Sequence, residues 1–168
     1  MKITAKRLEL QPFSSPQLNL FVNNPKQLTR ELALMQELKP LSSHMKKVYH
    51  LKETRIEEEP FSLIYNTYFA IILKEPRIMI GSLGLNGKPD DEGIIEVGYW
   101  IEELYQNRGF MKEALEAFLH WILKFNEVSG VNACTSDINI SSQKVLIACG
   151  FDRIYKDKDL LIWRYTSL

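Results

Sequence analysis

The chain has 168 residues, 45% of them hydrophobic, with 21 Lys and Arg side chains balanced by 21 Asp and Glu. This length fits one domain with its own core, and the apolar content excludes a disordered chain. A zero net charge argues against a nucleic-acid binder that attracts phosphates over its whole surface. No apolar run approaches the ~18 residues of a membrane span, and no N-terminal segment resembles a signal peptide. We therefore expect a cytoplasmic protein that binds neither membrane nor nucleic acid.

The cysteines and histidines show no pattern typical of a metal site. Cys134 and Cys149 lie in apolar segments, which predicts two reduced thiols in the core. The sequence has no C-x-x-C pair, and its three histidines share no ligand spacing. We expect neither a disulfide framework nor a bound metal.

The first 60 residues predict one strand followed by about three helices. Residues 3–11 alternate weakly between apolar and polar side chains, as a strand does. Ser15-Pro16 and Asn24-Pro25 each join a capping residue to a proline, a common start of a helix. Residues 42–59 are compatible with a third helix, which Pro60 would end.

From residue 67 onward the sequence predicts mainly strands. Thr67–Leu73, Ile78–Leu85 and Ile94–Ile101 are apolar runs separated by turn residues, which favours an antiparallel meander. Lys112–Asn126 repeats apolar residues at helical spacing. A strand at 131–135, a helix at 141–149 and strands at 151–154 and 160–165 complete the order. The pattern predicts an α+β domain built on one mixed sheet.

The segment around Gly109 carries the clearest functional signal. A strand runs into the turn Gln106–Met111, and a helix follows at once. The first turn of a helix offers unpaired N–H groups and a partial positive charge, so it can bind a phosphate, and Arg108 could add a charge-assisted contact. A lone glycine before a helix is also a common structural turn. The sequence contains neither a nucleoside-triphosphate P-loop nor a dinucleotide-binding fingerprint.

The same turn resembles the acetyl-CoA motif of the GNAT superfamily of N-acetyltransferases, Q/R-x-x-G-x-G/A, here Gln106-x-x-Gly109-x-Met111. Its sixth position departs from Gly/Ala, and Gly109-Phe110-Met111-Lys112-Glu113-Ala114-Leu115 resembles instead the RimJ/RimL-like branch, related to ribosomal-protein N-terminal acetyltransferases. Three further segments resemble family elements in the same order: Thr4–Leu10 (T-x-R-L-x-L, with one extra residue), Glu96–Ile101 (E-[IV]-G-Y-x-[IV]) and Asn139-x-x-Ser142 before Gly150-Phe151 (N-x-x-S…G-F).

This resemblance implies a single GNAT domain over residues 1–168. Its mixed, mostly antiparallel sheet would splay between the fourth and fifth strands, here Ile94–Ile101 and Val131–Thr135, with helices flanking it. The pantetheine arm of acetyl-CoA would lie in that opening. The residues that the resemblance assigns to cofactor binding are Trp100, Ile101, Gln106, Asn107, Arg108, Gly109, Phe110, Met111, Lys112, Asn139 and Ser142.

The family reaction is direct attack of an amine on the acetyl thioester, and it requires a neutral amine. Glu96, on the strand beside the opening, is the candidate general base, although a cross-strand pair would also explain a carboxylate there. In many family members, a tyrosine four residues before the Gly-Phe pair acts as the general acid for the departing thiolate, but that position is Leu146 here. Ser142 is the candidate hydrogen-bond donor to the departing thiolate, and a bond from its hydroxyl to the helix backbone is the alternative. Tyr99 and Trp100 fit core positions as well as a cleft.

The predicted function is therefore acetyl transfer from acetyl-CoA to an amine, on a protein N-terminus or a small molecule. Helices within residues 15–59 would form one wall of the acceptor site. One alternative is a catalytically inactive CoA-binding sensor or regulatory module, which would keep the turn at Gly109 without depending on Glu96 or Ser142. Another is a scaffold protein without a CoA site. GNAT proteins often dimerise, which makes a homodimer a further expectation.

Overall fold

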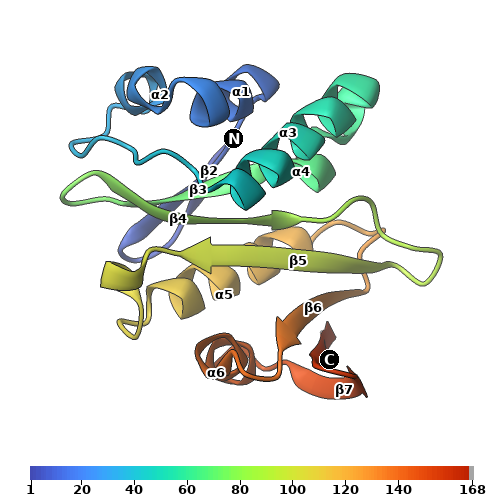
Figure 1. Cartoon of the computed structure of the whole chain (residues 1–168). Coiled ribbons are helices and arrows are strands. Elements are labelled where there is room, and N and C mark those ends of the chain that lie inside the picture. The colour runs from blue at the N-terminus through green and yellow to red at the C-terminus, as the bar shows by residue number, and fades with distance from the viewer. Residues whose placement is uncertain (167–168) are drawn as a thin grey trace.

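The structure, a computed structural model, describes residues 1–166, which build one sheet in the order β1-β2-β3-β4-β5-β6-β8-β7 (Figure 1). Only β5 and β6 are parallel neighbours in this sheet; all the other adjacent strands of the described chain run antiparallel. The strands are β1 (Ile3–Thr4), β2 (Leu8–Pro12), β3 (Tyr68–Leu73), β4 (Ile78–Leu85), β5 (Ile94–Ile101), β6 (Gly130–Ser136), β7 (Asp152–Asp157) and β8 (Leu160–Thr166).

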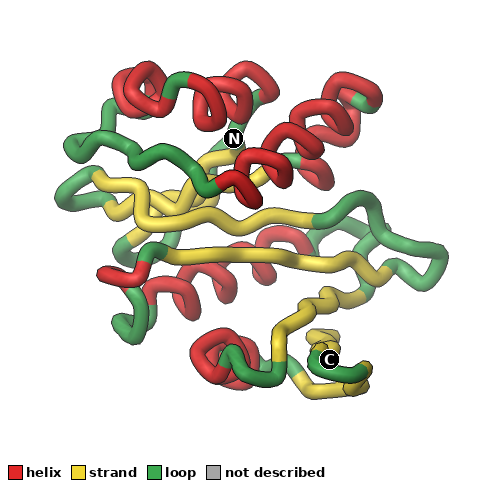
Figure 2. Tube along the Cα trace, in the orientation of Figure 1, coloured by secondary structure: helices red, strands yellow, loops and turns green. Residues whose placement is uncertain are grey.

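The helices form two layers, one on each face of the sheet (Figures 1 and 2). One layer comprises α1 (Ser15–Asn23), α2 (Pro25–Glu31), α3 (Ser43–Glu58) and α4 (Leu63–Asn66). The other contains α5 (Phe110–Ile122), with α6 (Ile140–Ala148) beside β6. Each layer has its own apolar cluster: Phe13, Phe21 and Tyr49 lie under the first, and Phe69 and Phe118 under the second.

Local sequence patterns placed most of these elements correctly. The bounds of β4 and β5 agree with the prediction, and β3, β4 and β5 form the expected antiparallel meander. Asn24 caps α2, and Ser42 caps α3, which ends just before Glu59-Pro60. Gly150 follows α6 with φ 86°, the left-handed conformation that favours glycine after a helix.

Several details differ from the prediction, among them the strand predicted at 151–154, which is β7 and extends to Asp157. Residues 3–11 form two paired strands rather than one, because the chain turns back between Thr4 and Leu8. The N-cap of α1 is Ser14, whose hydroxyl accepts the Gln17 N–H, so Ser15 lies inside the helix. A 3₁₀ turn (Pro60–Ser62) and α4 were not predicted. Helix α5 begins at Phe110 rather than Lys112 and ends at Ile122, because burial of Phe110 and Met111 draws the first turn into the core.

The sheet opens where β5 and β6 separate. These strands pair only from Ile94↔Gly130 to Val97↔Ala133. Beyond Val97, β5 continues along β4 alone, whereas β6 beyond Ala133 continues along β8 alone. Figure 1 shows β6 diverging from β5 towards α6. The predicted splay is therefore confirmed; the strands involved are numbered β5 and β6 because the N-terminal segment forms two strands.

The prediction that both cysteines are core residues is wrong for Cys134. Cys149 is buried, but Cys134 is exposed, because its side chain points to the face of β6 opposite to that of its buried neighbours Ala133 and Thr135. Burial of part of the thiol and the nearby Glu96 carboxylate raise the pKa of Cys134. None of the helices in residues 1–166 is long and apolar enough to span a bilayer.

Candidate acetyl-CoA site

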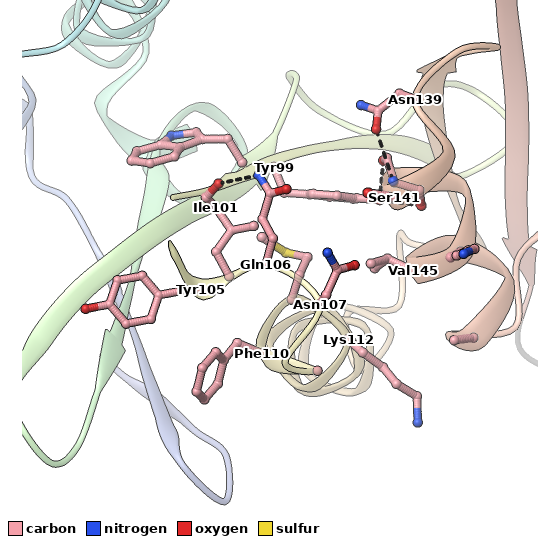
Figure 3. Close-up of a pocket in the computed structure, with 16 residues that line it drawn as sticks. Tyr99, Ile101, Tyr105, Gln106, Asn107, Phe110, Lys112, Asn139, Ser141 and Val145 are labelled. Carbon is pink, nitrogen blue, oxygen red and sulfur yellow. Dashed lines mark hydrogen bonds between the residues drawn. The ribbon is translucent and has the colours of Figure 1, made fainter. Parts of the chain in front are cut away.

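A cavity of about 460 Å³ lies where β5 and β6 separate (Figure 3). It is enclosed by the end of β5, the turn before α5, the first turn of α5 and one face of α6. Its lining residues are Tyr99, Trp100, Ile101, Tyr105, Gln106, Asn107, Gly109, Phe110, Met111, Lys112, Asn139, Ser141, Ser142, Lys144, Val145 and Ala148. All the sequence-predicted cofactor residues except Arg108 are therefore brought together around one cavity.

The turn before α5 is shaped to present backbone N–H groups. Asn107 and Gly109 have φ values of 57° and 74°, so both adopt the left-handed conformation. Within the described chain, no side chain caps α5, and the N–H groups of Phe110, Met111 and Lys112 in its first turn lack helical acceptors. These free donors and the positive end of the helix dipole fit a phosphate. The turn therefore has the features that the pyrophosphate of CoA requires.

Two arginines hold this turn from outside the cavity. The Arg7 Nε donates to Glu113 Oε2 at 2.6 Å, and Arg7 Nη1 donates to the Arg108 carbonyl at 3.3 Å. The Arg7 guanidinium also lies 4.3 Å from the centre of the Phe110 ring. The Arg108 guanidinium lies over the same ring at 5.2 Å, and Arg108 does not line the cavity. Sequence reasoning did not assign Arg7 to the site, although it belongs to the segment Thr4–Leu10 that resembles the family opening.

Polar contacts organise the opposite wall of the cavity. The Asn139 side chain caps α6, because its Oδ1 accepts the Ser142 N–H at 3.1 Å. The Ser142 hydroxyl oxygen lies 2.8 Å from the Tyr99 hydroxyl oxygen. Figure 3 shows Tyr99 reaching from β5 towards the first turn of α6, where Asn139 and Ser141 lie. Tyr99 thus lines the site instead of filling only the core.

The environment of Tyr99 keeps its phenol protonated. Burial raises the pKa of Tyr99 to about 12, and the hydrogen bond with Ser142 opposes this rise. Tyr99 therefore stays neutral across the physiological range and can donate its proton in a hydrogen bond.

Two lysines bring positive charge to the cavity, Lys112 from the first turn of α5 and Lys144 from α6. Lys112 and Lys144 both line the cavity, and Lys112 Nζ is 3.3 Å from Glu116 Oε1 on the same helix. The Gln106 amide instead donates to the Ile101 carbonyl at 3.3 Å, which ties the turn to the end of β5 (Figure 3). Among the described residues, no group of three or more His, Cys, Asp or Glu side chains could hold a metal ion.

Glu96 lies on the other face of β5 from Tyr99, because successive strand residues alternate between faces. Its carboxylate is exposed and accepts a hydrogen bond from the Asn86 side chain at 2.6 Å. Nearby, the buried Lys52 donates to the Leu85 carbonyl at 2.6 Å. Burial lowers the pKa of Lys52 to about 8, although the Glu96 carboxylate acts in the opposite direction. The structure therefore separates the candidate base Glu96 from Ser142 by the thickness of the sheet.

A second cavity, of about 360 Å³, adjoins Trp100 on the face that carries α1 and α3. Its walls come from α1, the segment between α2 and α3, the first turn of α3, and the strands β4 and β5. Trp100 lines both cavities. Its buried indole nitrogen makes no hydrogen bond within residues 1–166. It lies close to the Tyr49 hydroxyl and lowers the pKa of that group, whereas burial raises it.

The family model for the acetyltransferase (GNAT) domain matches residues 7–152. The chain belongs to the GNAT acetyltransferase family. As a member, it is an acyltransferase that uses acetyl-CoA. A curated relative, the "Uncharacterized N-acetyltransferase YjdG" of Bacillus subtilis (strain 168), is 25% identical over 166 residues, which is 98% of each chain.

Solved structures with the same fold include ribosomal-protein acetyltransferases. The ribosomal L7/L12 α-N-protein acetyltransferase RimL in complex with coenzyme A is 16% identical, with a TM-score of 0.70 over 99% of this chain and 98% of that one. The ribosomal-protein-S5-alanine acetyltransferase from Vibrio fischeri is 19% identical, with a TM-score of 0.67 over 99% of this chain and 96% of that one. At these identities the likeness shows the shared GNAT fold.

Sequence reasoning about this GNAT protein missed four cavity residues of α6: Ser141, Lys144, Val145 and Ala148. Their spacing of three, one and three residues places them along one side of a helix. The motif match ended at Ser142 and gave no reason to follow that side further. Helical periodicity from Ser141 onward is the signal that could have found them.

Proposed function

We propose that this GNAT enzyme acetylates a primary amine, on a protein N-terminus or a small molecule, with Glu96 as general base and Ser142 as hydrogen-bond donor to the sulfur. The observation that carries the proposal is the uncapped first turn of α5, which faces the cavity between β5 and β6. When bound there, acetyl-CoA supplies the activated acetyl group. The residues of this chain bind it, orient it and move the proton of the amine.

Two groups of cofactor residues suit two different parts of acetyl-CoA, the pyrophosphate and the pantetheine arm. The N–H groups from Gly109 to Lys112 suit the pyrophosphate, and the ammonium groups of Lys112 and Lys144 add attraction. Past Val97, the edge of β5 that faces β6 has no strand partner in residues 1–166. The backbone of Trp100 and Ile101 can therefore pair with the amides of the pantetheine arm.

The acceptor amine approaches from the face of β5 that carries Glu96. Gly98 supports this direction, because a methyl group added there would meet only the Asn86 side-chain nitrogen, at 3.8 Å. Glu96, Gly98 and Trp100 lie on the same face of the strand, so an open position separates the candidate base from the second cavity. Helices α1 and α3 then form the acceptor wall that the sequence predicted.

The chemical class of the amine decides how strong a base is needed. At pH 7 an α-amino group with a pKa of about 7.8 is roughly one tenth neutral, whereas a lysine amine with a pKa of about 10.4 is neutral roughly once in 2,500. An exposed carboxylate such as Glu96 suffices more readily for an α-amino group. The names of the ribosomal-protein acetyltransferases among the solved structures support the same first choice, a protein N-terminus.

A two-stage experiment tests this proposal. Thermal melting with and without CoA is first compared for the wild type, Gly109→Glu and Gly87→Glu. Gly87 also has a positive φ, 103°, but lies outside the cavity, so its variant controls for backbone strain. Thiol release from acetyl-CoA is then measured with peptides beginning with Ser, Ala or Met, and with spermidine and free lysine.

We expect CoA to raise the melting temperature of the wild type and of Gly87→Glu, but not of Gly109→Glu. We also expect at least one amine to be acetylated. CoA binding without turnover of any amine would support the sensor module instead, and no binding at all would contradict the cofactor site.

We further propose that two copies associate through β7, the outer strand of the sheet. All of β7 is exposed, including Ile154 and Tyr155. In an antiparallel pair centred on Tyr155, Arg153 would face Asp157 of the second copy, so the charges complement each other. Light scattering after size exclusion tests this: the wild type is expected as a dimer and Tyr155→Lys as a monomer, whereas a monomeric wild type would refute it.

A further inference from the structure

The hydroxyl of Tyr99 contacts the hydroxyl of Ser142 across the opening between β5 and α6. The two oxygen atoms are 2.8 Å apart, and the residues are 43 positions apart in the chain. Val97, two residues before Tyr99, is the last β5 residue that pairs with β6. The contact therefore bridges the two walls of the cofactor cavity, immediately beyond the point where the strands separate.

The Ser142 hydroxyl has one proton and two lone pairs to use. Its only hydrogen-bond partner among residues 1–166 is the Tyr99 hydroxyl. The Ser142 backbone N–H is separately held by the Asn139 side chain at 3.1 Å, which fixes the position of the residue in the first turn of α6. Among residues 1–166 the Tyr99 hydroxyl has two acceptors, both on Ser142: the hydroxyl oxygen at 2.8 Å and the carbonyl oxygen at 3.4 Å. If Tyr99 donates to the nearer one, the hydroxyl oxygen, the Ser142 proton must point elsewhere. The cavity is the space available, since Ser142 lines it.

We propose that Tyr99 is a positioning residue for the proposed acetyl transfer: by donating its proton to Ser142, it turns the Ser142 hydroxyl proton towards the sulfur of bound CoA. This inference rests on the proposed function and adds a residue to it. Tyr99 has no contact with the reacting atoms in this assignment and acts through Ser142.

The chemistry of the step is balanced without an additional reactant. The amine nitrogen forms a bond to the acetyl carbon, the carbon–sulfur bond breaks, and the sulfur leaves with the electron pair as a thiolate. The proton of the amine passes to Glu96. Ser142 stabilises the negative sulfur by a hydrogen bond, and Tyr99 strengthens that bond by polarising the Ser142 hydroxyl.

The raised pKa of Tyr99, about 12, supports a donor role. A free thiol has a pKa near 8.5, so a phenol that is this weakly acidic keeps its proton beside a thiolate. Tyr99 therefore keeps its proton in the bond to Ser142, and the Ser142 hydroxyl offers the sulfur a hydrogen bond instead of a proton.

The decisive measurement uses CoA alone and needs no acceptor. The thiolate of bound CoA absorbs in the ultraviolet, so the pKa of its thiol can be titrated, with the desulfo-CoA complex as the blank. The wild type, Tyr99→Phe, Ser142→Ala and the double variant are compared. Tyr99→Phe keeps the ring and removes only the hydroxyl, and Ser142→Thr serves as the control that keeps a hydroxyl at position 142.

We expect the bound thiol of the wild type to have a pKa below that of free CoA. Tyr99→Phe and Ser142→Ala should each raise it by about half a unit to one unit, the size expected for one hydrogen bond. The double variant should show no further rise, and Ser142→Thr should remain close to the wild type. The charges of Lys112 and Lys144, the thiol of Cys149 and the N-terminus of α6 also face this region, but they are unchanged in all five proteins.

Kinetics with the best amine give the second readout. Tyr99→Phe should lower kcat about tenfold and change the KM for acetyl-CoA less than twofold, with no further loss of kcat in the Ser142→Ala background. A Tyr99→Phe effect that persists in that background, or an unchanged thiol pKa in Tyr99→Phe, would overturn the inference while leaving the cofactor site intact. Failure of the wild type to bind CoA would overturn the proposed function as well.

Discussion

Gly84 and Gly98 stand opposite each other on β4 and β5, yet only one of them has room for a side chain. A methyl group at Gly84 would collide with the Thr67 carbonyl and approach the Tyr68 ring to 2.8 Å. At Gly98 its nearest neighbour would be the Asn86 side-chain nitrogen at 3.8 Å. Packing therefore explains the glycine at position 84 and does not explain the one at position 98.

This contrast gives the first prediction. Gly84→Ala should lower the free energy of unfolding by about 1–3 kcal/mol, because the added methyl overpacks the β3–β4 region. Gly98→Ala should leave the free energy of unfolding within about 0.5 kcal/mol and raise the KM for the amine, because it narrows the proposed acceptor path. Urea denaturation and steady-state kinetics check both. An unchanged KM in a folded Gly98→Ala protein would mean that the amine does not pass this position.

The second prediction concerns the base. Glu96→Gln keeps the shape of the side chain and can still accept from Asn86, but it cannot take a proton from the amine. We expect kcat to fall about 10²-fold near neutral pH, the lower end of general-base effects. The loss should shrink as the pH passes the pKa of the amine, since the amine is then already neutral. A pH series with one acceptor checks this, and a loss that is constant with pH would contradict a base role.

The third prediction tests the support of the phosphate-binding turn. The Arg7 side chain donates to both Glu113 on α5 and the Arg108 carbonyl in the turn. Arg7→Ala removes both of these hydrogen bonds, so the turn loses its support. Because the Arg7 side chain is partly exposed, we expect a cost of about 1 kcal/mol or less in folding stability. We expect a larger effect on CoA, about a tenfold weaker Kd by titration calorimetry. Arg30→Ala, on the exposed side of α2, is the matched control and should leave Kd unchanged.

The fourth prediction follows from Lys52. Burial lowers its pKa from 10.5 in the unfolded chain to about 8 in the folded protein. Between these values the unfolded state binds more protons, so the Lys52 contribution to stability rises with pH. The wild type should therefore gain up to about 3 kcal/mol relative to Lys52→Met as the pH rises from 8 to 10.5. Urea denaturation of both proteins across this range checks the sign, and a constant difference would mean that the Lys52 pKa is not lowered.

The sequence by itself determined the local structures of this protein. Alternation and turn residues defined β4 and β5, the Asn24-Pro25 pair marked the start of α2, and the Gly109 turn was recognisable from its motif. These features depend on residues within a few positions of each other, so hydrophobic patterning and backbone preferences suffice to predict them.

Only the tertiary structure decided how the site is assembled. The pairing register ends at Val97 and Ala133, and that end point opens the cavity. The contacts of Tyr99 with Ser142 and of Arg7 with Glu113 join residues 43 and 106 positions apart. No local preference specifies such pairs, because they result from the packing of whole strands and helices against one another. For the same reason, the sequence could name Glu96 and Ser142 but not show that Ser142, on α6, contacts Tyr99 on the face of β5 opposite to Glu96.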